Sequence, residues 1–430
     1  MSSPSGGADI LVSRRLKVVL WAAAAATAVV VNGPQFVGLA RPPAGGYLDF
    51  VQEWLSARNV LAGDPAYLPQ RESLRRRAGD DVPAFDREMR WNAHPPVAVL
   101  VALPFGLITD YRDAHLAWTL ATFPLFVLSV LVVARELGVR PEWWHVLPFV
   151  ALTVTSFPVM TQIGQGQLNF VLLPLLVAGW AADRRGYPVT AGFAFGLATA
   201  VKLFPGFVFV YLLFARRWRT LVAGAVACVL ANGLAVAVLG ADAFTTYARE
   251  VVPSLGVFRT SWRNVSLPGF WQRLLNPQGM ETLAVVLALA SQLAIAGVAA
   301  RLAWRAKTEA DHDRAFAAAM IGMLLASPVA WPHYFLLLLV PAGVLWVYLP
   351  PGSSRWLFLA LLPLFWIPDT TFAVRALGRE RAADIVRFEA NSPGVAASLT
   401  GLAVFTYALL GLFALVVRTK FAERSSEYGG

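Results

Sequence analysis

Charged side chains are scarce in this sequence of 430 residues. Only 14% of the residues are Asp, Glu, Lys or Arg, whereas 57% are hydrophobic, and the mean hydropathy is +0.58. A soluble domain commonly carries about 25% charged residues to cover its surface. The deficit is explained if lipid replaces water around most of the chain, and we therefore expect an integral membrane protein.

Cysteine is also nearly absent. The single residue, Cys228, lies in an apolar run, which excludes an intrachain disulfide and says nothing about the compartment. The sequence has no Cys/His cluster with metal-ligand spacing, no Walker loop and no GxGxxG motif after a strand. We therefore expect neither a metal nor a cofactor.

The formal net charge of +10 does not indicate nucleic-acid binding, because the basic residues form short groups between apolar runs. They occur as "SRRLK" (13–17), "DRRG" (183–186), "ARRWR" (215–219), "RLAWRAK" (301–307) and "RTK" (418–420). Lys and Arg in short cytoplasmic loops produce this pattern. It predicts that all five groups, and both chain ends, are cytoplasmic in a multi-pass protein of the cell membrane.

The apolar runs predict an all-α bundle of about 12 transmembrane helices, because isolated strands leave backbone groups unsatisfied in lipid. The candidate spans are 16–38, 96–109, 115–134, 146–161, 168–182, 188–201, 203–214, 220–239, 282–303, 314–328, 333–349, 355–367 and 396–417. Thirteen spans conflict with two cytoplasmic ends, so either 96–109 is re-entrant or 188–214 is one kinked helix. The first span also resembles a signal peptide, but the many later spans favour a retained helix.

These assignments divide the chain into a cytoplasmic N-terminus (1–15), a transmembrane domain (16–417) and a cytoplasmic tail (418–430). The first extracytoplasmic loop covers 39–95, and the second large one covers 240–281. The stretches 162–169, 327–334 and 368–395 also fall on the outer face, which therefore carries most of the unusual polar residues.

The stretch "YLDFVQEWLSARN" (47–59) places acids directly outside the first span. A helix there would put Asp49, Gln52 and Glu53 on one face, with Trp54 and its apolar neighbours toward the lipid headgroups. Asp49 then has two interpretations. It is an N-cap that accepts backbone N–H bonds, or a general base at the lip of a membrane cavity.

Two further polar residues stand in apolar surroundings. Lys202, in "GLATAVKLFPGF", either extends to the interface or binds a phosphate. His333, in "SPVAWPHYF", either anchors the chain at the interface or orients a phosphate.

The remaining polar motifs carry similar alternatives. Gln165, Gln167 and Asn169 in "GQGQLN" form a polar turn or a ligand site whose glycines admit a ligand to the backbone. Arg263 and Asn264 either belong to a solvated loop or hold a phosphate or a sugar. His94, in "NAHPP", favours a structural role from its sequence context.

The order of these motifs resembles that of glycosyltransferase family 87. The resemblance runs from about residue 45 to 345 and rests on the order of several short motifs rather than on any single one. They are "DF" after the first span, "AGDPAY" (62–67), "NAHPP" (92–96), "GQGQLN", "KLFP" (202–205), "RNVSLPG" (263–269) and "WPHY" (331–334). The family comprises membrane enzymes of GT-C type, including polyprenyl-phosphate-mannose-dependent α-mannosyltransferases.

The resemblance implies an inverting hexosyltransferase that moves a sugar, mannose above all, from a polyprenyl-phosphate donor to a hydroxyl of a glycolipid or glycan at the outer face of the cytoplasmic membrane. It implies Asp49 as the catalytic base and matches Lys202 and His333 to family positions, and together with Arg263 we expect these two to bind the donor phosphate. Residues that orient the acceptor or the sugar would be Glu53, Gln52, Gln165, Gln167, Asn169, Asn264 and His94.

This sequence departs from the family pattern where it reads His94-Pro95-Pro96 and where no acid or second His accompanies His333, so the acceptor stays open. The alternative function is a lipid or sugar transporter or flippase. A transporter would show symmetric halves, and the sequence shows no clear internal repeat.

Overall fold

The computed structural model describes residues 14–86, 90–386 and 393–419, and within these ranges the chain is helical, with no strand. The expectation of an all-α membrane protein is therefore confirmed. The longer helices are α1 (Arg14–Ala40), α4 (Pro96–Gly106), α5 (Tyr111–Glu136), α6 (Val146–Thr155), α8 (Asn169–Arg184), α9 (Pro188–Val201), α11 (Trp218–Leu239), α15 (Glu281–Arg305), α16 (Glu309–Ala326), α17 (Leu339–Tyr348) and α22 (Val404–Arg418). Shorter ones are α2 (Val51–Leu61), α3 (Gln70–Ala78), α7 (Phe157–Gln165), α10 (Val208–Phe214), α12 (Ala241–Thr246), α13 (Val252–Ser254), α14 (Leu267–Leu275), α18 (Ser353–Leu361), α19 (Asp369–Leu377), α20 (Arg379–Val386) and α21 (Val395–Leu399).

Five helical segments of the described chain are long and apolar enough to cross a membrane, and two bent pairs raise the number to seven. The bent pairs are 143–155 with 157–165, and 353–366 with 369–377. Four shorter apolar helical stretches accompany them, at 96–106, 188–201, 204–214 and 332–348. The twelve crossings expected from the sequence remain a prediction, because several of these segments are shorter than the roughly 20 residues that span a bilayer.

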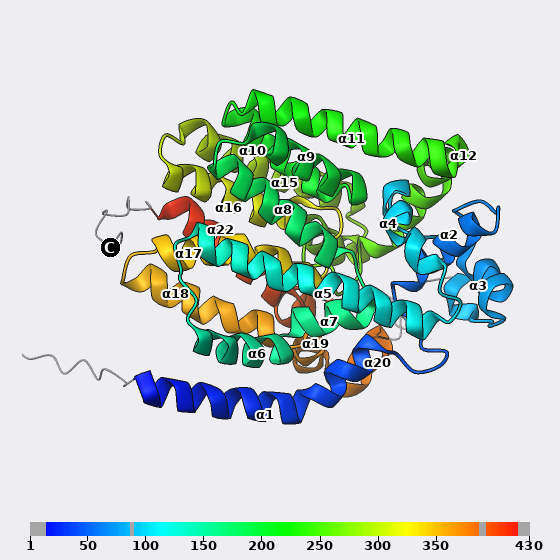
Figure 1. Ribbon diagram of the computed structural model, residues 1–430, viewed down its shortest axis with the longest axis horizontal. Helices are drawn as coiled ribbons and strands as arrows, with labels where there is room; N and C mark the ends of the chain where they lie inside the picture. The colour runs from blue at the N-terminus through cyan, green and yellow to red at the C-terminus, as the bar shows by residue number, and fades with distance from the viewer. Residues whose placement is uncertain (1–13, 87–89, 387–392, 420–430) are drawn as a thin grey trace, which may run out of the picture.

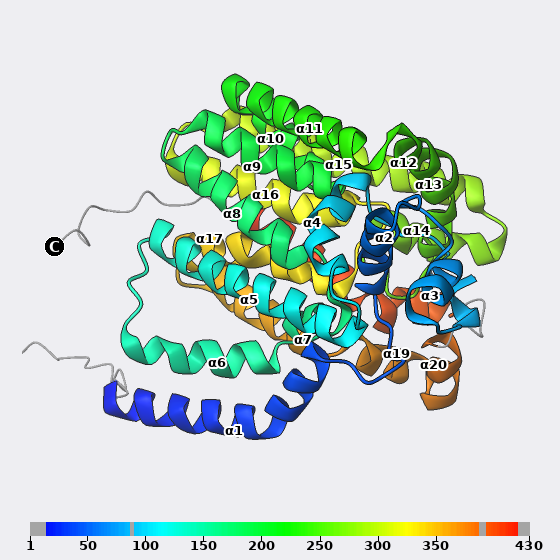
Figure 2. The same ribbon diagram turned by 45° about the vertical axis from the view of Figure 1, so that its right-hand side comes forward.

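The two ends of the molecule differ. The helix α1 begins, and α22 ends, at the same end of the bundle, whereas the short helices α2, α3 and α20 gather at the opposite end (Figures 1 and 2). Most of the expected cytoplasmic segments 1–15 and 418–430 lies outside the described residues.

The sequence prediction for α2 was wrong in one respect. The side chains of Val51, Trp54 and Leu55 do not face lipid headgroups but are fully buried. The helix packs against α4, and the Trp54 indole donates a hydrogen bond of 2.9 Å to the backbone oxygen of Ile108. The neighbouring Phe50 ring stacks on Trp118 of α5 at 5.0 Å. These aromatic contacts hold α2 inside the protein rather than at its interface with lipid.

The helices α9 and α11 approach each other through small residues. A Cβ atom added at Gly196 of α9 would lie 2.2 Å from the backbone oxygen of Gly224 in α11. Small residues allow such backbone approach, which is a main source of helix association in membranes. This packing fixes α9, the helix that leads to Lys202.

We expect Gly196→Ala to destabilise the protein by roughly 1–3 kcal/mol, because the added methyl group forces the two helices apart. Gly233→Ala in α11 is the matched control, since nothing lies within 4 Å of a Cβ atom there. The control gains about 0.5–1 kcal/mol of helix preference. Thermal unfolding in detergent micelles measures both, and a Gly196→Ala protein as stable as the control would contradict the packing.

Candidate active site

Three breaks between helices meet at the end of the bundle that holds α2. They are the turn before α2, the turn between α7 and α8, and the extended residue between α9 and the short 3-10 helix 204–207. The Gln167 side chain donates to a carboxylate oxygen of Asp49 at 2.7 Å and accepts from the Lys202 ammonium at 3.0 Å. One amide thus bridges a carboxylate and an ammonium group that are 153 residues apart in the sequence.

The orientation of the Gln167 amide follows from its two partners. An ionised carboxylate only accepts hydrogen bonds, and an ammonium group only donates them. The NH2 group must therefore face Asp49, and the carbonyl oxygen must face Lys202. Reversing the amide would lose both bonds, so this bridge is specific for an acid at one end and a cation at the other.

Gly166 allows the turn to approach α2. Its φ angle of 62° is left-handed, and an added Cβ atom would lie 2.6 Å from the Cβ of Phe50. The preceding residue, Gln165, accepts the backbone N–H of Phe50 at 2.9 Å through its own backbone oxygen. Its side-chain oxygen accepts from the backbone N–H of Asp49 at 3.4 Å. The glycine therefore places both glutamines of the motif against Asp49.

Asp49 does not act as an N-cap of α2. The cap position is Phe50, and no side chain caps this helix. Asp49 lies in the preceding turn and is partly exposed. Burial is the main cause that raises its pKa above the ordinary value, while the Gln167 bond and the nearby charges of His94 and Lys202 oppose this effect.

Glu53 lies one helical turn after Asp49 and is 2% exposed. Its carboxylate contacts Nδ1 of His94 directly. The side-chain oxygen of Gln52 accepts the backbone N–H of Ala93 at 2.9 Å, and the Asn92 amide donates to the Gln52 backbone oxygen at 3.2 Å. The "NAHPP" segment is therefore bound to α2 by Gln52 and Glu53, which lie on the polar face that the sequence predicts for this helix.

Lys202 is buried rather than extended to the interface, with 6% of its surface exposed. It caps the C-terminal end of α9 in an extended conformation. Its ammonium lies 4.5 Å from the centre of the Tyr334 ring, which stacks on Phe204 at 5.0 Å. Gln167 and this aromatic face stabilise the cation, as expected for a partly desolvated ammonium.

A second chain of hydrogen bonds leads from the same turn to His333. The Asn169 amide donates to the Gln162 side chain at 2.8 Å and to the His333 backbone oxygen at 3.4 Å. His333 is 5% exposed, and its Nε2 atom has no hydrogen-bond partner among the described residues. A buried imidazole nitrogen without a partner is unusual in proteins and is available to a ligand.

Arg263 and Asn264 lie together in the sequence but have different surroundings. The Arg263 guanidinium pairs with Asp369 at 2.6 Å and retains 31% side-chain exposure. Asn264 is fully buried. Its amide donates to the backbone oxygens of Arg259 and Pro328, and its oxygen accepts from the N–H groups of Ser266 and Ala330. These four bonds favour a structural role for Asn264, which ties the Arg263 loop to the segment that carries His333.

Two residues that support this region do not stand out in the sequence. Asp369 directly follows Pro368 in a polar loop, and Arg273 lies in the amphipathic stretch of α14. The Arg273 guanidinium is 2% exposed and donates to the backbone oxygens of Ser261 and Asn264 at 3.0 and 2.9 Å. A fully buried arginine is rare, but burial is not visible in the sequence.

We expect Gly166→Ala to destabilise the protein more than Gly63→Ala. Both positions have a positive φ, 62° and 79°, but only Gly166 has neighbours within 4 Å of an added Cβ atom. Backbone strain is common to both, whereas the clash with Phe50 adds roughly 1–3 kcal/mol at Gly166. Thermal unfolding in micelles measures the difference, and equal losses would show that the close approach is not required.

Comparisons with known proteins give the same family that the motifs suggested. The polyprenol-phosphate-mannose-dependent alpha-(1-2)-phosphatidylinositol pentamannoside mannosyltransferase of Mycobacterium tuberculosis is 29% identical over 297 residues, which cover 64% of this chain and 64% of that protein. The enzyme of the same name from Mycolicibacterium smegmatis is 27% identical over 290 residues, 64% of this chain and 67% of that one. The match thus spans less than two thirds of the Mycobacterium tuberculosis relative.

Among solved structures, ArnT from Cupriavidus metallidurans bound to undecaprenyl phosphate is similar with a TM-score of 0.40 and 18% identity, over 94% of this chain and 77% of that one. The family model of glycosyltransferase family 87 matches residues 92–328, more than half of the chain. The chain belongs to glycosyltransferase family 87.

Proposed function

We propose that this protein transfers mannose from a polyprenyl-phosphate-mannose donor to a hydroxyl group of a glycolipid or glycan, with inversion at the anomeric carbon. The observation that carries the proposal is the Asp49–Gln167–Lys202 bridge. It places one carboxylate and one buried ammonium side by side without direct contact. An acceptor hydroxyl that loses a proton needs a base such as the carboxylate. A phosphate that leaves with negative charge needs a cation such as the ammonium.

Asp49 is the base in this proposal. Its carboxylate removes the proton of the acceptor hydroxyl while that oxygen attacks the anomeric carbon, and the bond from that carbon to the phosphate oxygen breaks on the opposite face. A single displacement of this kind inverts the centre and needs no covalent intermediate, so one carboxylate suffices. The partial exposure of Asp49 leaves it accessible to the acceptor.

The leaving phosphate needs positive charge and hydrogen-bond donors rather than an acid. Lys202 supplies a fixed charge, and a preorganised cation stabilises the charge that develops in the transition state. His333 contributes its unpartnered Nε2 atom, in its N–H tautomer, as a donor. Arg263 contributes the N–H groups that its contact with Asp369 leaves available.

Glu53 and His94 orient the sugar or the acceptor in this scheme. The Glu53 carboxylate fixes Nδ1 of His94, which leaves Nε2 as the imidazole atom for a sugar hydroxyl. The side-chain oxygens of Gln52 and Gln165 each accept a backbone N–H group, so we assign both residues to holding the loop. Asn169 holds the His333 segment.

The names of the relatives suggest the substrates. Both are called polyprenol-phosphate-mannose-dependent, and both names include alpha-(1-2)-phosphatidylinositol pentamannoside mannosyltransferase. We propose the same donor class for this chain and a lipid-linked mannoside as acceptor. The direct test is incubation of the purified protein with labelled polyprenyl-phosphate mannose and a phosphatidylinositol mannoside. Transfer of label together with release of polyprenyl phosphate supports the function, whereas lipid movement without release would favour a transporter.

We expect Asp49→Asn to reduce the rate of transfer by roughly 10² to 10⁴, the usual contribution of a positioned base. The change keeps the size of the side chain and removes only the group that accepts the proton. Binding of the donor should persist, because its charge is met by Lys202. Initial rates at saturating donor measure the effect, and an Asp49→Asn enzyme within about threefold of wild type would contradict the mechanism.

Glu53→Gln is the control for that change. Because Glu53 has a positioning role in this proposal, its substitution should reduce the rate of transfer less than Asp49→Asn does.

The pH profile of wild-type activity gives an independent check. Asp49 acts when it is ionised, so activity falls as the pH drops through its pKa. Because burial raises that pKa, the decline in wild type begins at a higher pH than for an ordinary aspartate. The residual activity of Asp49→Asn should lack this decline.

We expect Lys202→Gln to weaken binding of the lipid donor by about tenfold or more, because a hydrogen bond to a charged group contributes roughly 1.5–3 kcal/mol. Titration of the purified protein with the polyprenyl-phosphate donor measures this loss. Lys17→Gln, at an exposed position of α1, is the matched control. Donor binding by Lys202→Gln that equals the control would assign Lys202 a purely structural role.

We propose that the site faces the extracytoplasmic side of the cell membrane, since the basic groups lie in the connections at the other end of the bundle. An Ala78→Cys protein on a Cys228→Ala background should react with a membrane-impermeant maleimide in intact cells. Ala306→Cys, between α15 and α16, should react only after the cells are opened. The reverse pattern would invert the topology.

A further inference from the structure

A second polar region lies at the other end of the helices that carry the candidate active site. The helix α8 begins at Asn169, beside the site, and its 16 residues extend about 24 Å to Arg184. The helix α9 returns to Lys202, and α10 leads away again to Arg217. A cavity of about 330 Å³ lies among these distal ends. It is therefore distinct from the proposed catalytic site.

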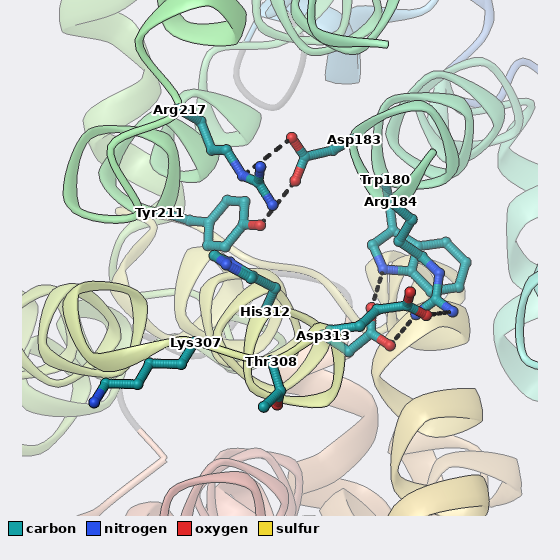
Figure 3. Close-up of a pocket in the computed structure, with 10 residues that line it drawn as sticks. Trp180, Asp183, Arg184, Tyr211, Arg217, Lys307, Thr308, His312 and Asp313 are labelled. Carbon is teal, nitrogen blue, oxygen red and sulfur yellow. Dashed lines mark hydrogen bonds and ion pairs between the residues drawn. The ribbon is translucent and has the colours of Figure 1, made fainter. Parts of the chain in front are cut away.

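The cavity is bordered by α8, α10, the residue before α11, the connection from α15 to α16, and the beginning of α16 (Figure 3). Its lining side chains are Trp180, Asp183, Arg184, Tyr211, Arg217, Lys307, Thr308, Glu309, His312 and Asp313. Three segments that are far apart in the sequence therefore contribute charged groups to one opening.

The carboxylates of the cavity are already engaged. Arg184 pairs with both Asp313 and Glu309. Asp183 accepts from the Tyr211 hydroxyl at 2.9 Å and lies 3.5 Å from Nε of Arg217. These contacts neutralise the acids from within the protein, so the cavity has little capacity left for a cationic ligand.

Two groups of the cavity are not engaged by its acids. Nδ1 of His312 is buried and has no hydrogen-bond partner in the described part of the chain. The Lys307 side chain is exposed, extends away from the ion pairs (Figure 3), and forms no ion pair with any described residue. A buried polar atom without a partner is unusual, and an exposed ammonium beside an imidazole N–H suits an anion.

The surroundings indicate a lipid rather than a soluble anion. Trp218 and Trp304 flank the cavity segments in the sequence and are 55% and 57% exposed. The Arg216 guanidinium lies 4.0 Å from the centre of the Trp304 ring. Exposed tryptophans beside arginines at helix ends are typical of the membrane–water interface, where phospholipid headgroups lie.

We propose that this cavity binds the phosphate of an anionic phospholipid headgroup. The Lys307 ammonium and Nδ1 of His312, in its N–H tautomer, hold the phosphate oxygens, and the ion pairs of Arg184 and Arg217 form the wall behind them. Basic pockets between membrane helices commonly bind anionic headgroups. The lipid is bound at this site without reacting, and the site is separate from the proposed donor site.

Lys307→Gln tests the proposal without disturbing the fold, because its exposed side chain forms no ion pair in the described structure. Arg219→Gln is the matched control, since Arg219 is exposed, belongs to the same basic end and does not line the cavity. Native mass spectrometry of the full chain in non-ionic micelles, titrated with phosphatidylglycerol or phosphatidylcholine, measures lipid binding. A second arm adds inorganic phosphate at equal ionic strength.

Wild type should retain phosphatidylglycerol in preference to phosphatidylcholine, and Lys307→Gln should weaken the binding of phosphatidylglycerol about fivefold, the effect of one basic residue near a membrane surface. Arg219→Gln should bind as wild type does. Equal weakening in both variants would indicate general surface attraction and overturn the proposal. Displacement of the lipid by inorganic phosphate at comparable concentration would overturn the lipid assignment.

Discussion

The amide of Gln167 separates two opposite charges that would otherwise neutralise each other. Direct contact between Asp49 and Lys202 would lower the basicity of the acid and occupy the cation. With the amide between them, at 2.7 and 3.0 Å, each charge is stabilised on one side and remains available on the other. The turn at Gly166, the break after α9 and the burial of α2 all serve to hold these three groups in line.

The sequence singles out Asp49 as an acid directly outside the first apolar run and Lys202 as a cation within another run, and in the structure a glutamine of "GQGQLN" joins them. Their proposed catalytic roles stay predictions. The burial of α2 was not predictable, because a helix with acids on one face and aromatics on the other suits a lipid interface as well as a protein interior. The partnership of Arg263 with Asp369 was also invisible, since the two lie 106 positions apart and nothing in either motif specifies the other.

The helical fold itself follows from composition, whereas the number of crossings does not. Lipid requires that backbone groups be satisfied within a segment, so the apolar runs had to be helices. Several of those runs are short or bent, such as the pair 143–155 and 157–165, which turns by 61°. A short helix that packs inside a bundle and one that crosses a thinned membrane carry the same residues. Composition therefore determines the helices but not how each one meets the bilayer.

The two acids near the site differ in what their surroundings permit. Glu53 is 2% exposed, and its carboxylate is in contact with His94, so removing a proton from a substrate would first require that pair to separate. Asp49 is partly exposed and has one oxygen engaged by Gln167. A base must reach its substrate and must hold a proton briefly, and burial that raises the pKa of Asp49 favours the second requirement without preventing the first. In the proposed mechanism, Asp49 before α2 provides the carboxylate for chemistry and Glu53 within α2 the one for position, and the difference arises from their partners rather than from the residues themselves.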